Sequence, residues 1–426
     1  MKTIEQIAAE LQGYDPQALS TDAVTAFLQR LVLPITGTER VPLASALGRV
    51  LAEDVVSPFS VPPHDNSAMD GFAFDGAQLV PGQPLRLKIV GTALAGPAWH
   101  GSVAPGECVK ITTGAVMPAG LDTVVPQEFT RIDGDTVTVP ADVLRPGHNR
   151  RRAGEDLMAG QPALLQGELL APAALGLLAS LGLGEVIVRR RLRVAYFSTG
   201  DEILSLGEPP REGAVYDSNR ATICALLARL GVELIELGVV RDEPARLEAA
   251  FREAAARADA VITSGGVSMG EADHTKAMMR KLGDVAFWRI AMRPGRPMAV
   301  GRIAGDGRDA LLFGLPGNPV AAMVSFIAFV RPALLRLMGA HPRPPVLLRA
   351  ASAVPIRKKP GRTEYQRGIV TQQPDGSLQV RPTGHQGSGV LSSMVQANGL
   401  IVLAHAQGDV AVGDAVSVMM FEGATG

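Results

Sequence analysis

A glycine-rich turn followed by carboxylates carries the strongest chemical signal in the chain. Residues 259–276 read DAVITSGGVSMGEADHTK, a short apolar segment that runs into glycines and serines and then into Glu271 and Asp273. Glycine permits positive φ angles and close approach of a ligand, and free N–H groups at the start of a following helix attract phosphate. A carboxylate beside a phosphate is typical of bound Mg²⁺. The segment lacks the Walker A and dinucleotide-binding patterns, so it indicates an anion site of open identity or only a tight strand–helix connection.

Three more polar turns follow apolar segments and precede helical ones. They read STGDE at 198–202, RDE at 241–243 and LPGNP at 315–319. In an open α/β sheet, ligands bind beyond the carboxyl ends of the strands, where these turns would meet the glycine-rich turn. Their glycines, hydroxyls and carboxylates predict a site for a phosphorylated ligand with a divalent cation. The alternative is that all four turns are helix caps, a role for which Asp242 and Ser218 are suited.

Two arginines provide a second anion signal. Arg293 and Arg296 flank a Pro-Gly turn in the segment AMRPGRP. Such a turn can direct both guanidinium groups at one oxyanion, which arginine binds through paired hydrogen bonds. The alternative is a pair of solvated arginines on a loop.

Two polar loops, PPHDNSAMDGFAF and ITTGAVMP, interrupt strand-like sequence near the N-terminus. They single out Asp65, Asp70 and Thr113, because loops on a scaffold commonly carry function. Ordinary Asx-turns are the alternative for both aspartates.

The order of strand-like and helix-like segments predicts the fold class. From about residue 192 to 340 the two alternate, which is typical of a doubly wound, mostly parallel sheet with helices on both faces. Short, regularly spaced apolar segments on either side predict β domains. We therefore expect an α/β plus β multidomain chain with a discontinuous helical linker domain at 1–55 and 152–190, an inserted β domain at 56–151, an α/β domain at 191–343 and a C-terminal β-barrel at 344–426.

The composition limits which binding partners and which cellular compartment are expected. The 426 residues carry a formal net charge of -1, so no overall field attracts nucleic acid or an anionic membrane. A basic cluster at 150–152 is the local exception, with a solvated face as the alternative. Cys108 and Cys224 are too few for a disulfide framework, and Glu5 and Glu10 interrupt what would be a signal peptide, so a cytoplasmic protein is expected. The apolar segments 169–184 and 320–330 are shorter than the ~20 residues that span a bilayer and are expected to be buried helices.

Ten segments, taken in order, resemble the sequence blocks of the molybdopterin molybdenumtransferases, the MoeA/gephyrin family. The resemblance covers nearly the whole chain, from about residue 20 to 420. The segments are PPHDNSAMDGFAF, ITTGAVMPAGLDTVV, NRRRAGEDLMAG, FSTGDEIL, VYDSNR, TSGGVSMGEADHTK, MRPGRPMAVG, GLPGNPVAA, GRTEYQRG and TGHQGSG.

The resemblance implies an enzyme that takes adenylylated molybdopterin and molybdate, cleaves the pyrophosphate with Mg²⁺, and releases AMP and molybdenum cofactor. It also implies an elongated homodimer, in which the α/β domain of one subunit and the β domain of the other form the active site. Other molybdenum-cofactor assembly proteins are further expected partners, whereas nucleic acid and membranes are not.

The matching blocks also imply roles for individual residues. Catalytic roles fall on Asp65, Thr113, Asp156, Glu202, Asp242 and Asp273, of which Glu202, Asp242 and Asp273 would bind Mg²⁺. Binding of the pterin and its phosphates falls on Thr199, Gly200, Asp201, Asp217, Asn219, Ser264, Gly265, Gly266, Ser268, Gly270, Pro316, Gly317, Asn318 and Pro319. The surroundings of molybdate would be Arg293, Arg296, Arg362 and Ser388, and Arg296 stands where the family commonly has lysine.

Two other functions remain open from the sequence. A molybdopterin adenylyltransferase has a similar α/β fold but lacks the β domain and the C-terminal barrel. A non-catalytic scaffold of the gephyrin type is the second alternative, and the presence of Asp65, Glu202 and Asp273 argues against it.

Overall fold

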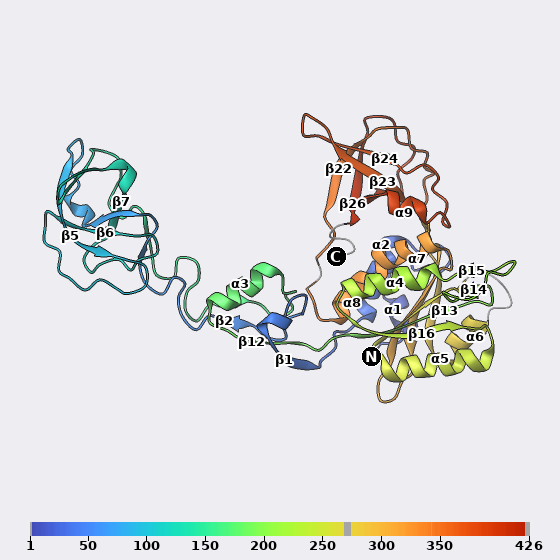
Figure 1. The fold of residues 1–426 in the computed structure, drawn as a ribbon. Coiled ribbons are helices and arrows are strands. Elements are labelled where there is room, and N and C mark those ends of the chain that lie inside the picture. The colour runs from blue at the N-terminus through green and yellow to red at the C-terminus, as the bar shows by residue number, and fades with distance from the viewer. Residues whose placement is uncertain (1, 268–273, 342, 422–426) are drawn as a thin grey trace.

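The structure is a computed structural model that describes residues 2–267, 274–341 and 343–421. A β domain at one end is joined by a narrow linker to a larger body, which consists of the α/β domain and the C-terminal barrel (Figure 1). The chain is therefore elongated, and the β domain stands well away from the α/β domain.

The α/β domain is built on a six-stranded sheet. Its order is β16 (Glu233–Val240), β13 (Arg193–Thr199), β17 (Ala260–Ser264), β21 (Ala310–Leu315), β20 (Pro297–Ile303) and β18 (Gly283–Arg289). The first four strands are parallel, whereas β20 and β18 form an antiparallel extension. The predicted mostly parallel sheet is confirmed.

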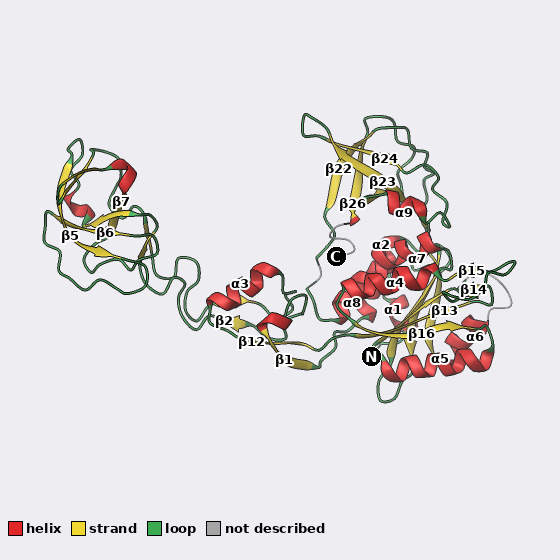
Figure 2. Cartoon of the chain, in the orientation of Figure 1, coloured by secondary structure: helices red, strands yellow, loops and turns green. Residues whose placement is uncertain are grey.

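Helices cover both faces of this sheet (Figure 2). Alternate residues of β13 point to opposite faces, so Val194 and Tyr196 enter one hydrophobic core while Ala195 and Phe197 enter the other. One face is covered by α4 (Ser218–Arg229), α7 (Pro319–Ser325), a π-helical turn (Phe326–Val330) and α8 (Arg331–Leu337). The other is covered by α5 (Pro244–Arg257) and α6 (His274–Leu282). A small pair of strands, β14 (Ile203–Leu204) and β15 (Val215–Tyr216), lies between β13 and α4 in the chain.

One helical stretch of the described residues, Pro319–Leu337, is long and apolar enough to cross a membrane. However, 67% of its most apolar window is buried inside the protein. Val320, Phe326 and Leu334 pack in the core of the α/β sheet. This stretch is a core helix, which confirms the buried helix predicted at 320–330.

The N-terminal helices α1 (Ile4–Ala9) and α2 (Thr21–Leu31) pack on the α/β sheet rather than in the linker. Phe27 of α2 meets Trp288 of β18 edge to face, with ring centroids 4.9 Å apart. This differs from the expectation that residues 1–55 belong to the linker domain. The apolar side of α2, with Val24 and Leu31, completes the core of the α/β domain.

The linker itself is built on paired strands. β1 (Thr38–Pro42) pairs antiparallel with β12 (Glu185–Arg189), and β2 (Val55–Val56) pairs with β11 (Pro162–Leu164). A 3₁₀ turn (Leu43–Ser45) and the single α-helix α3 (Pro172–Ser180) lie between them. The helical character predicted for the linker was wrong, because its two halves pair as strands, and this pairing cannot be seen in the sequence of either half.

Helix α3 is only partly buried, contrary to the buried helix predicted at 169–184. Leu178 alone among its residues is fully buried, whereas Leu175 and Leu177 are half-buried. Leu169 and Leu165, just before the helix, are 45% and 46% exposed. The linker thus carries an apolar surface that the chain itself does not cover.

The β domain holds a six-stranded sheet with a hydrophobic core on each face. The sheet order is β7 (Thr123–Pro126), β4 (Gly71–Phe74), β6 (Glu107–Ile111), β5 (Leu85–Ala93), β9 (Thr136–Val139) and β8 (Arg131–Asp133). Two 3₁₀ turns (Gly76–Gln78 and Gln127–Phe129) follow strands, and β3 (Asn66–Ser67) pairs with β10 (Arg150–Arg151) where the chain enters and leaves the domain.

The C-terminal domain is a closed barrel, as predicted. Its strands are β22 (Leu347–Ser352), β23 (Thr363–Gln372), β24 (Leu378–Pro382), β25 (Gly399–Leu403) and β26 (Ala415–Met420), with helix α9 (Ser392–Gln396) beside them. Pairing of β23 with β25 closes the ring. β23 also pairs with β19 (Met292–Arg293), so the barrel and the arginine turn of the α/β domain share a sheet.

Candidate active site

The four polar turns predicted from the sequence meet at the carboxyl ends of the parallel strands. The Gly265 N–H donates to the carbonyl of Leu315 at 3.1 Å, which joins the glycine-rich turn to the end of β21. The Asp242 N–H donates to Oδ1 of Asp201 at 3.3 Å, which joins the ends of β13 and β16. Because parallel strands end at one edge, turns far apart in sequence line a single site.

Glycine is required in the turn after β17 for steric reasons. Gly265 has φ +90°, and a Cβ atom there would lie 2.4 Å from the carbonyl oxygen of Thr199. Gly266 has φ +65°, and its Cβ would lie 2.5 Å from Cβ of Thr275. The turn therefore packs against both β13 and α6 with bare backbone. Ser268, Gly270 and Asp273 lie outside the described residues.

A cluster of buried hydroxyl groups fixes the strand ends beneath this turn. The Tyr196 hydroxyl lies 2.7 Å from Oγ of Ser264 and 3.0 Å from Oγ of Ser198. Burial raises the pKa of Tyr196, so its hydroxyl stays protonated as a hydrogen-bonding group. The Ser264 side chain is thus engaged inside the sheet.

Two buried acceptors at the start of α4 have no partner among the described residues. Asp217 caps the helix through Oδ1, which accepts the Arg220 N–H at 3.0 Å, but its Oδ2 is unpaired. Asn219 donates from Nδ2 to the Gly317 carbonyl at 2.7 Å, and its Oδ1 is also unpaired. A buried acceptor without a donor is costly, so these atoms fit a ligand that brings N–H or O–H groups.

The carboxylates of the site lie at its rim. Asp201 and Glu202 are exposed, and Oδ1 of Asp242 accepts a hydrogen bond from the Thr275 hydroxyl at 3.2 Å. Arg211 and Arg241 both donate to the Asp201 carbonyl, Arg241 at 2.9 Å. The first turn is therefore held in place through its backbone, which leaves the Asp201 and Glu202 side chains facing solvent.

The arginine turn lies where the α/β domain meets the barrel. Arg293 and Arg296 are exposed, and the Arg293–Pro294 bond is cis. Gly295 has φ +92° and fits tightly against Oγ of Ser325 on α7. That both guanidinium groups face one oxyanion stays a prediction.

The barrel contributes directly to the same region. The Val320 N–H at the start of α7 donates to the carbonyl of Ser388 at 3.0 Å, which brings the barrel loop onto the LPGNP turn. That turn is exposed at Gly317 and Asn318, buried at Pro316 and half-buried at Pro319. The Arg362 guanidinium is tied to the buried Glu364 through Nε and Nη2, at 2.8 and 2.7 Å.

Comparison with known proteins assigns the family. Residues 19–182 match the MoeA N-terminal region (domains I and II), residues 195–336 a probable molybdopterin binding domain, and residues 349–421 the MoeA C-terminal region (domain IV). The molybdopterin molybdenumtransferase of Haemophilus influenzae is 41% identical over 400 residues, which cover 94% of this chain and 97% of that protein. The molybdopterin molybdenumtransferase 2 of Mycobacterium tuberculosis is 37% identical over 408 residues, covering 93% of this chain and 97% of that protein. The chain belongs to the MoeA family.

The solved structures agree with this assignment. The molybdopterin biosynthesis moeA protein from Pyrococcus horikoshii OT3 aligns with a TM-score of 0.77 and 28% sequence identity, covering 95% of this chain and 100% of that one. The chain is therefore a molybdopterin molybdenumtransferase, an enzyme that inserts molybdenum into molybdopterin. The resemblance stated from ten sequence blocks is confirmed.

Within the MoeA chain, Arg367 is a residue that the sequence reasoning missed. Its side chain is 1% exposed, Nε donates to Oγ of Ser393 at 2.9 Å, and Nη2 donates to the Gly387 carbonyl at 2.9 Å. Burial first, and the charge of Arg293 second, lower the pKa of Arg367 to about 10. Arg367 lies two residues after Tyr365 in the same strand. Side chains two residues apart in a strand point to the same face, so this spacing was the signal that could have placed Arg367 on the inward face with Tyr365.

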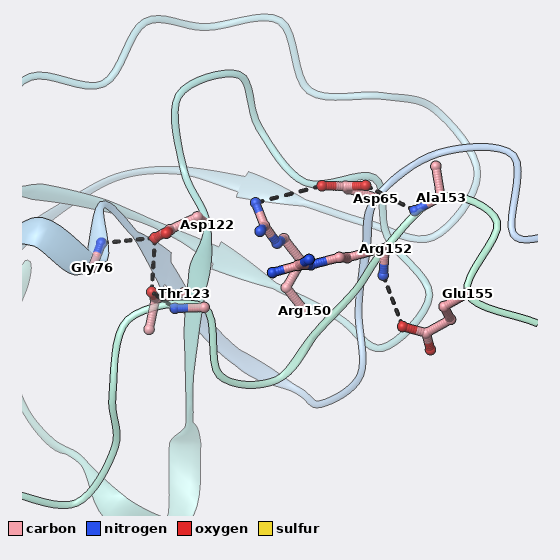
Figure 3. Close-up of polar contacts among 9 residues, drawn as sticks. Asp65, Gly76, Asp122, Thr123, Arg150, Arg152, Ala153 and Glu155 are labelled. Carbon is pink, nitrogen blue, oxygen red and sulfur yellow. Dashed lines mark hydrogen bonds and ion pairs between the residues drawn. The ribbon is translucent and has the colours of Figure 1, made fainter.

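The β-domain residues of the MoeA chain are not at the α/β edge of the same chain (Figure 1). Asp65 accepts the Ala153 N–H at 2.8 Å and lies 3.5 Å from Nη1 of Arg150 (Figure 3). Asp70 accepts the Thr113 N–H at 2.6 Å and the Thr113 hydroxyl at 2.9 Å. Neither contact is a local Asx-turn, because each aspartate joins loops far apart in sequence.

The rest of this region is also ordered by loop cross-links. The Asp156 N–H donates to the Val61 carbonyl at 3.1 Å, which places Asp156 beside the β3–β10 pair. In Figure 3, the Arg152 N–H reaches Oε2 of Glu155 at 2.9 Å, and Asp122 accepts hydrogen bonds from the Gly76 N–H and the Thr123 hydroxyl. Together these contacts place Asp65, Thr113 and Asp156 around the junction of the β domain with the linker.

Proposed function

We propose that this MoeA enzyme takes adenylylated molybdopterin and molybdate, cleaves the pyrophosphate with Mg²⁺, and releases AMP and molybdenum cofactor. The observation that carries the proposal is the pair of buried, unpaired acceptors on Asp217 and Asn219 beside the glycine turn. Carboxylates lie on one side of that turn and arginines on the other, so one edge offers groups for an organic ligand, a cation and an oxyanion.

The pterin nucleotide is assigned to the glycine-lined edge. Unpaired oxygens of Asp217 and Asn219 accept N–H or O–H groups of the substrate. Its phosphates are assigned to the glycine-rich sequence that follows β17, from the sequence pattern. Thr199, Gly200 and Ser264 shape the floor beneath, and the LPGNP turn closes the opposite side. Dithiolene sulfurs belong to the substrate, so the chemistry requires no cysteine from the protein.

The carboxylate rim fits Mg²⁺. This ion is usually held by one or two carboxylates together with substrate phosphate oxygens, and Glu202 and Asp242 offer that donor set on neighbouring turns. Asp273 is proposed as the third carboxylate from its sequence position alone. When bound, the ion neutralises charge on the pyrophosphate oxygens.

Molybdate is assigned to the junction of the arginine turn with the barrel. Arg293 and Arg296 are exposed on a rigid turn, and Arg367 adds a buried positive charge behind the loop that leads to Ser388. Arg362 is assigned a smaller contribution to molybdate binding, because Glu364 already neutralises its charge. Guanidinium groups suit a tetrahedral oxyanion, and placing it beside the pterin sulfurs is a matter of positioning.

The β-domain residues imply that the active enzyme is a homodimer. Asp65, Thr113 and Asp156 stand far from the α/β edge in one chain, so a second copy must supply them if they act there. The uncovered apolar surface of the linker, at Leu165, Leu169 and α3, offers a surface for such pairing. A cytoplasmic location and contact with other cofactor-assembly proteins belong to the same proposal.

The decisive experiment supplies adenylylated molybdopterin to the purified protein and follows AMP release and molybdenum cofactor together. Both should require Mg²⁺, and cofactor formation should saturate with molybdate. Asp217→Ala should weaken binding of the pterin nucleotide without changing the molybdate requirement. Formation of adenylylated molybdopterin and pyrophosphate from free molybdopterin and ATP would instead identify an adenylyltransferase. The absence of any AMP release would remove the proposed reaction.

A further inference from the structure

A hollow lined by arginines lies at the opposite end of the α/β sheet from the candidate active site. Its volume is 420 Å³, and it is lined by Glu39, Arg49, Arg190, Arg191, Arg193 and Glu233. Arg193 and Glu233 begin β13 and β16, so the hollow faces the amino ends of the parallel strands. On the linker side, Glu39 lies in β1 and Arg190 directly follows β12.

Part of this charge is neutralised within the protein. Arg190 holds both oxygens of Asp259, each at 2.7 Å, and Arg308 pairs with the same carboxylate. These contacts, led by the hydrogen bonds to Asp259, raise the pKa of Arg190. Arg49 is paired with Glu39 across the linker. The two ion-pair groups brace the wall of the hollow.

The remaining arginines have no carboxylate of their own. Arg191 donates to the Gly231 carbonyl at 2.6 Å and makes no ion pair among the described residues. Nε of Arg193 and Nε of Arg189 are buried and lack hydrogen-bond partners there. Arg193 is only half-buried, so its unpaired guanidinium is both desolvated and reachable. An ordinary solvated basic face would keep these atoms in water.

We propose that this hollow binds a small phosphate-bearing anion, held by Arg191 and Arg193 and reaching Arg49 on the linker side. Arginine is suited to phosphate because its planar fork donates two parallel hydrogen bonds. The site is concave, and arginines around it outnumber carboxylates two to one, whereas the whole chain is nearly neutral. A compact anion fits this arrangement, while an extended nucleic acid would require a broad positive surface. The bound anion would bridge the linker and the α/β domain.

Calorimetric titration of the full-length protein with inorganic phosphate, pyrophosphate and AMP, without Mg²⁺, tests the proposal. Arg193→Gln and Arg191→Gln should each weaken binding of the preferred anion by about tenfold, the effect of losing one charge-assisted hydrogen bond. Arg131→Gln, on the exposed strand β8, is the matched control and should bind like the wild type. Arg296→Ala should also retain this binding, which separates the hollow from any anion held at the proposed molybdate position.

Two results would contradict the proposal. If wild type and Arg193→Gln bind all three anions with the same affinity, or if none binds saturably, the hollow is not an anion site. Thermal unfolding of each variant, followed by circular dichroism, establishes that the comparison is made between folded proteins. Preference for AMP over inorganic phosphate would identify a nucleotide as the occupant, and the reverse order would identify a free phosphate.

Discussion

At the α/β edge, the side chains of Asp217 and Asn219 are buried, whereas Asp65 and Asp70 of the β-domain loops are more exposed and are held by other loops. Asp217 and Asn219 are 7% and 8% exposed, and the side chain of Asp65 is 40% exposed. The α/β edge therefore presents desolvated, pre-positioned groups within one chain. The polar side chains of the β-domain loops become desolvated when another surface covers them. We therefore assign these loops to the active site of the neighbouring subunit.

Mixing two inactive variants gives the largest expected effect and tests this division of labour. Asp65→Ala and Glu202→Ala should each lose nearly all AMP release as homodimers. After subunit exchange, half of the dimers are mixed and each has one intact site, so about a quarter of wild-type activity should return. If exchanged dimers form but remain as inactive as the parents, Asp65 and Glu202 do not act across subunits.

Two glycines of the α/β edge test how rigid its backbone must be. Gly265→Ala should destabilise the turn by about 2 kcal/mol or more and abolish most activity, because its φ is +90° and the new Cβ meets the Thr199 carbonyl. Gly317→Ala is the matched control, since the nearest atom to its Cβ is 3.8 Å away. Thermal unfolding and AMP release decide the matter, and equal tolerance of both changes would contradict a sterically required turn.

Two arginine variants distinguish molybdate binding from structural support at the junction of the arginine turn with the barrel. Arg296→Gln should raise the half-saturating molybdate concentration about tenfold and leave affinity for the pterin nucleotide unchanged. Arg362→Gln should instead lower thermal stability, because it leaves Glu364 buried without its cation, and change the molybdate requirement little. Separate titrations of the two ligands measure this, and a larger molybdate effect for Arg362→Gln would reverse the assignment.

The smallest effect is expected in the β domain, at Asp70. Hydrogen bonds from the Thr113 N–H and hydroxyl lower the pKa of Asp70, so the folded-state pKa lies below the unfolded one. The resulting stabilisation is present above the unfolded pKa, near about 4, and is lost as the pH falls through the folded pKa. Asp70→Asn should therefore make thermal unfolding less sensitive to acid below about pH 5. Identical acid sensitivity of wild type and Asp70→Asn would show that the contact does not stabilise the fold.

Strong local patterns made much of the fold predictable. The apolar run at 260–264 and the amphipathic helix at 244–257 appear in the structure as β17 and α5, because each has the period of its own element. Regular spacing of short strands likewise predicted the C-terminal barrel. By contrast, the pairing of β1 with β12 and the antiparallel pair of β18 and β20 were not foreseen, since a strand's partner depends on residues elsewhere in the chain.

In the candidate site, too, some residues could be identified from the sequence and others could not. Glycines, carboxylates and Arg293 with Arg296 could be named from their turns, because chemical type and backbone preference are local properties. Arg367 could not, because its meaning comes from burial beside the loop at 385–388 and from the charge of Arg293.

The sequence alone therefore determined the element types, the family resemblance and which side chains could bind anions or a cation. Tertiary structure decided which of those side chains are desolvated, which are already neutralised and which lie too far apart to act in one chain. Asp217 and Arg362 illustrate the difference: an unpaired buried oxygen invites a ligand, while a guanidinium held by Glu364 does not. Burial and pairing are relations between distant residues, and only the folded chain fixes them.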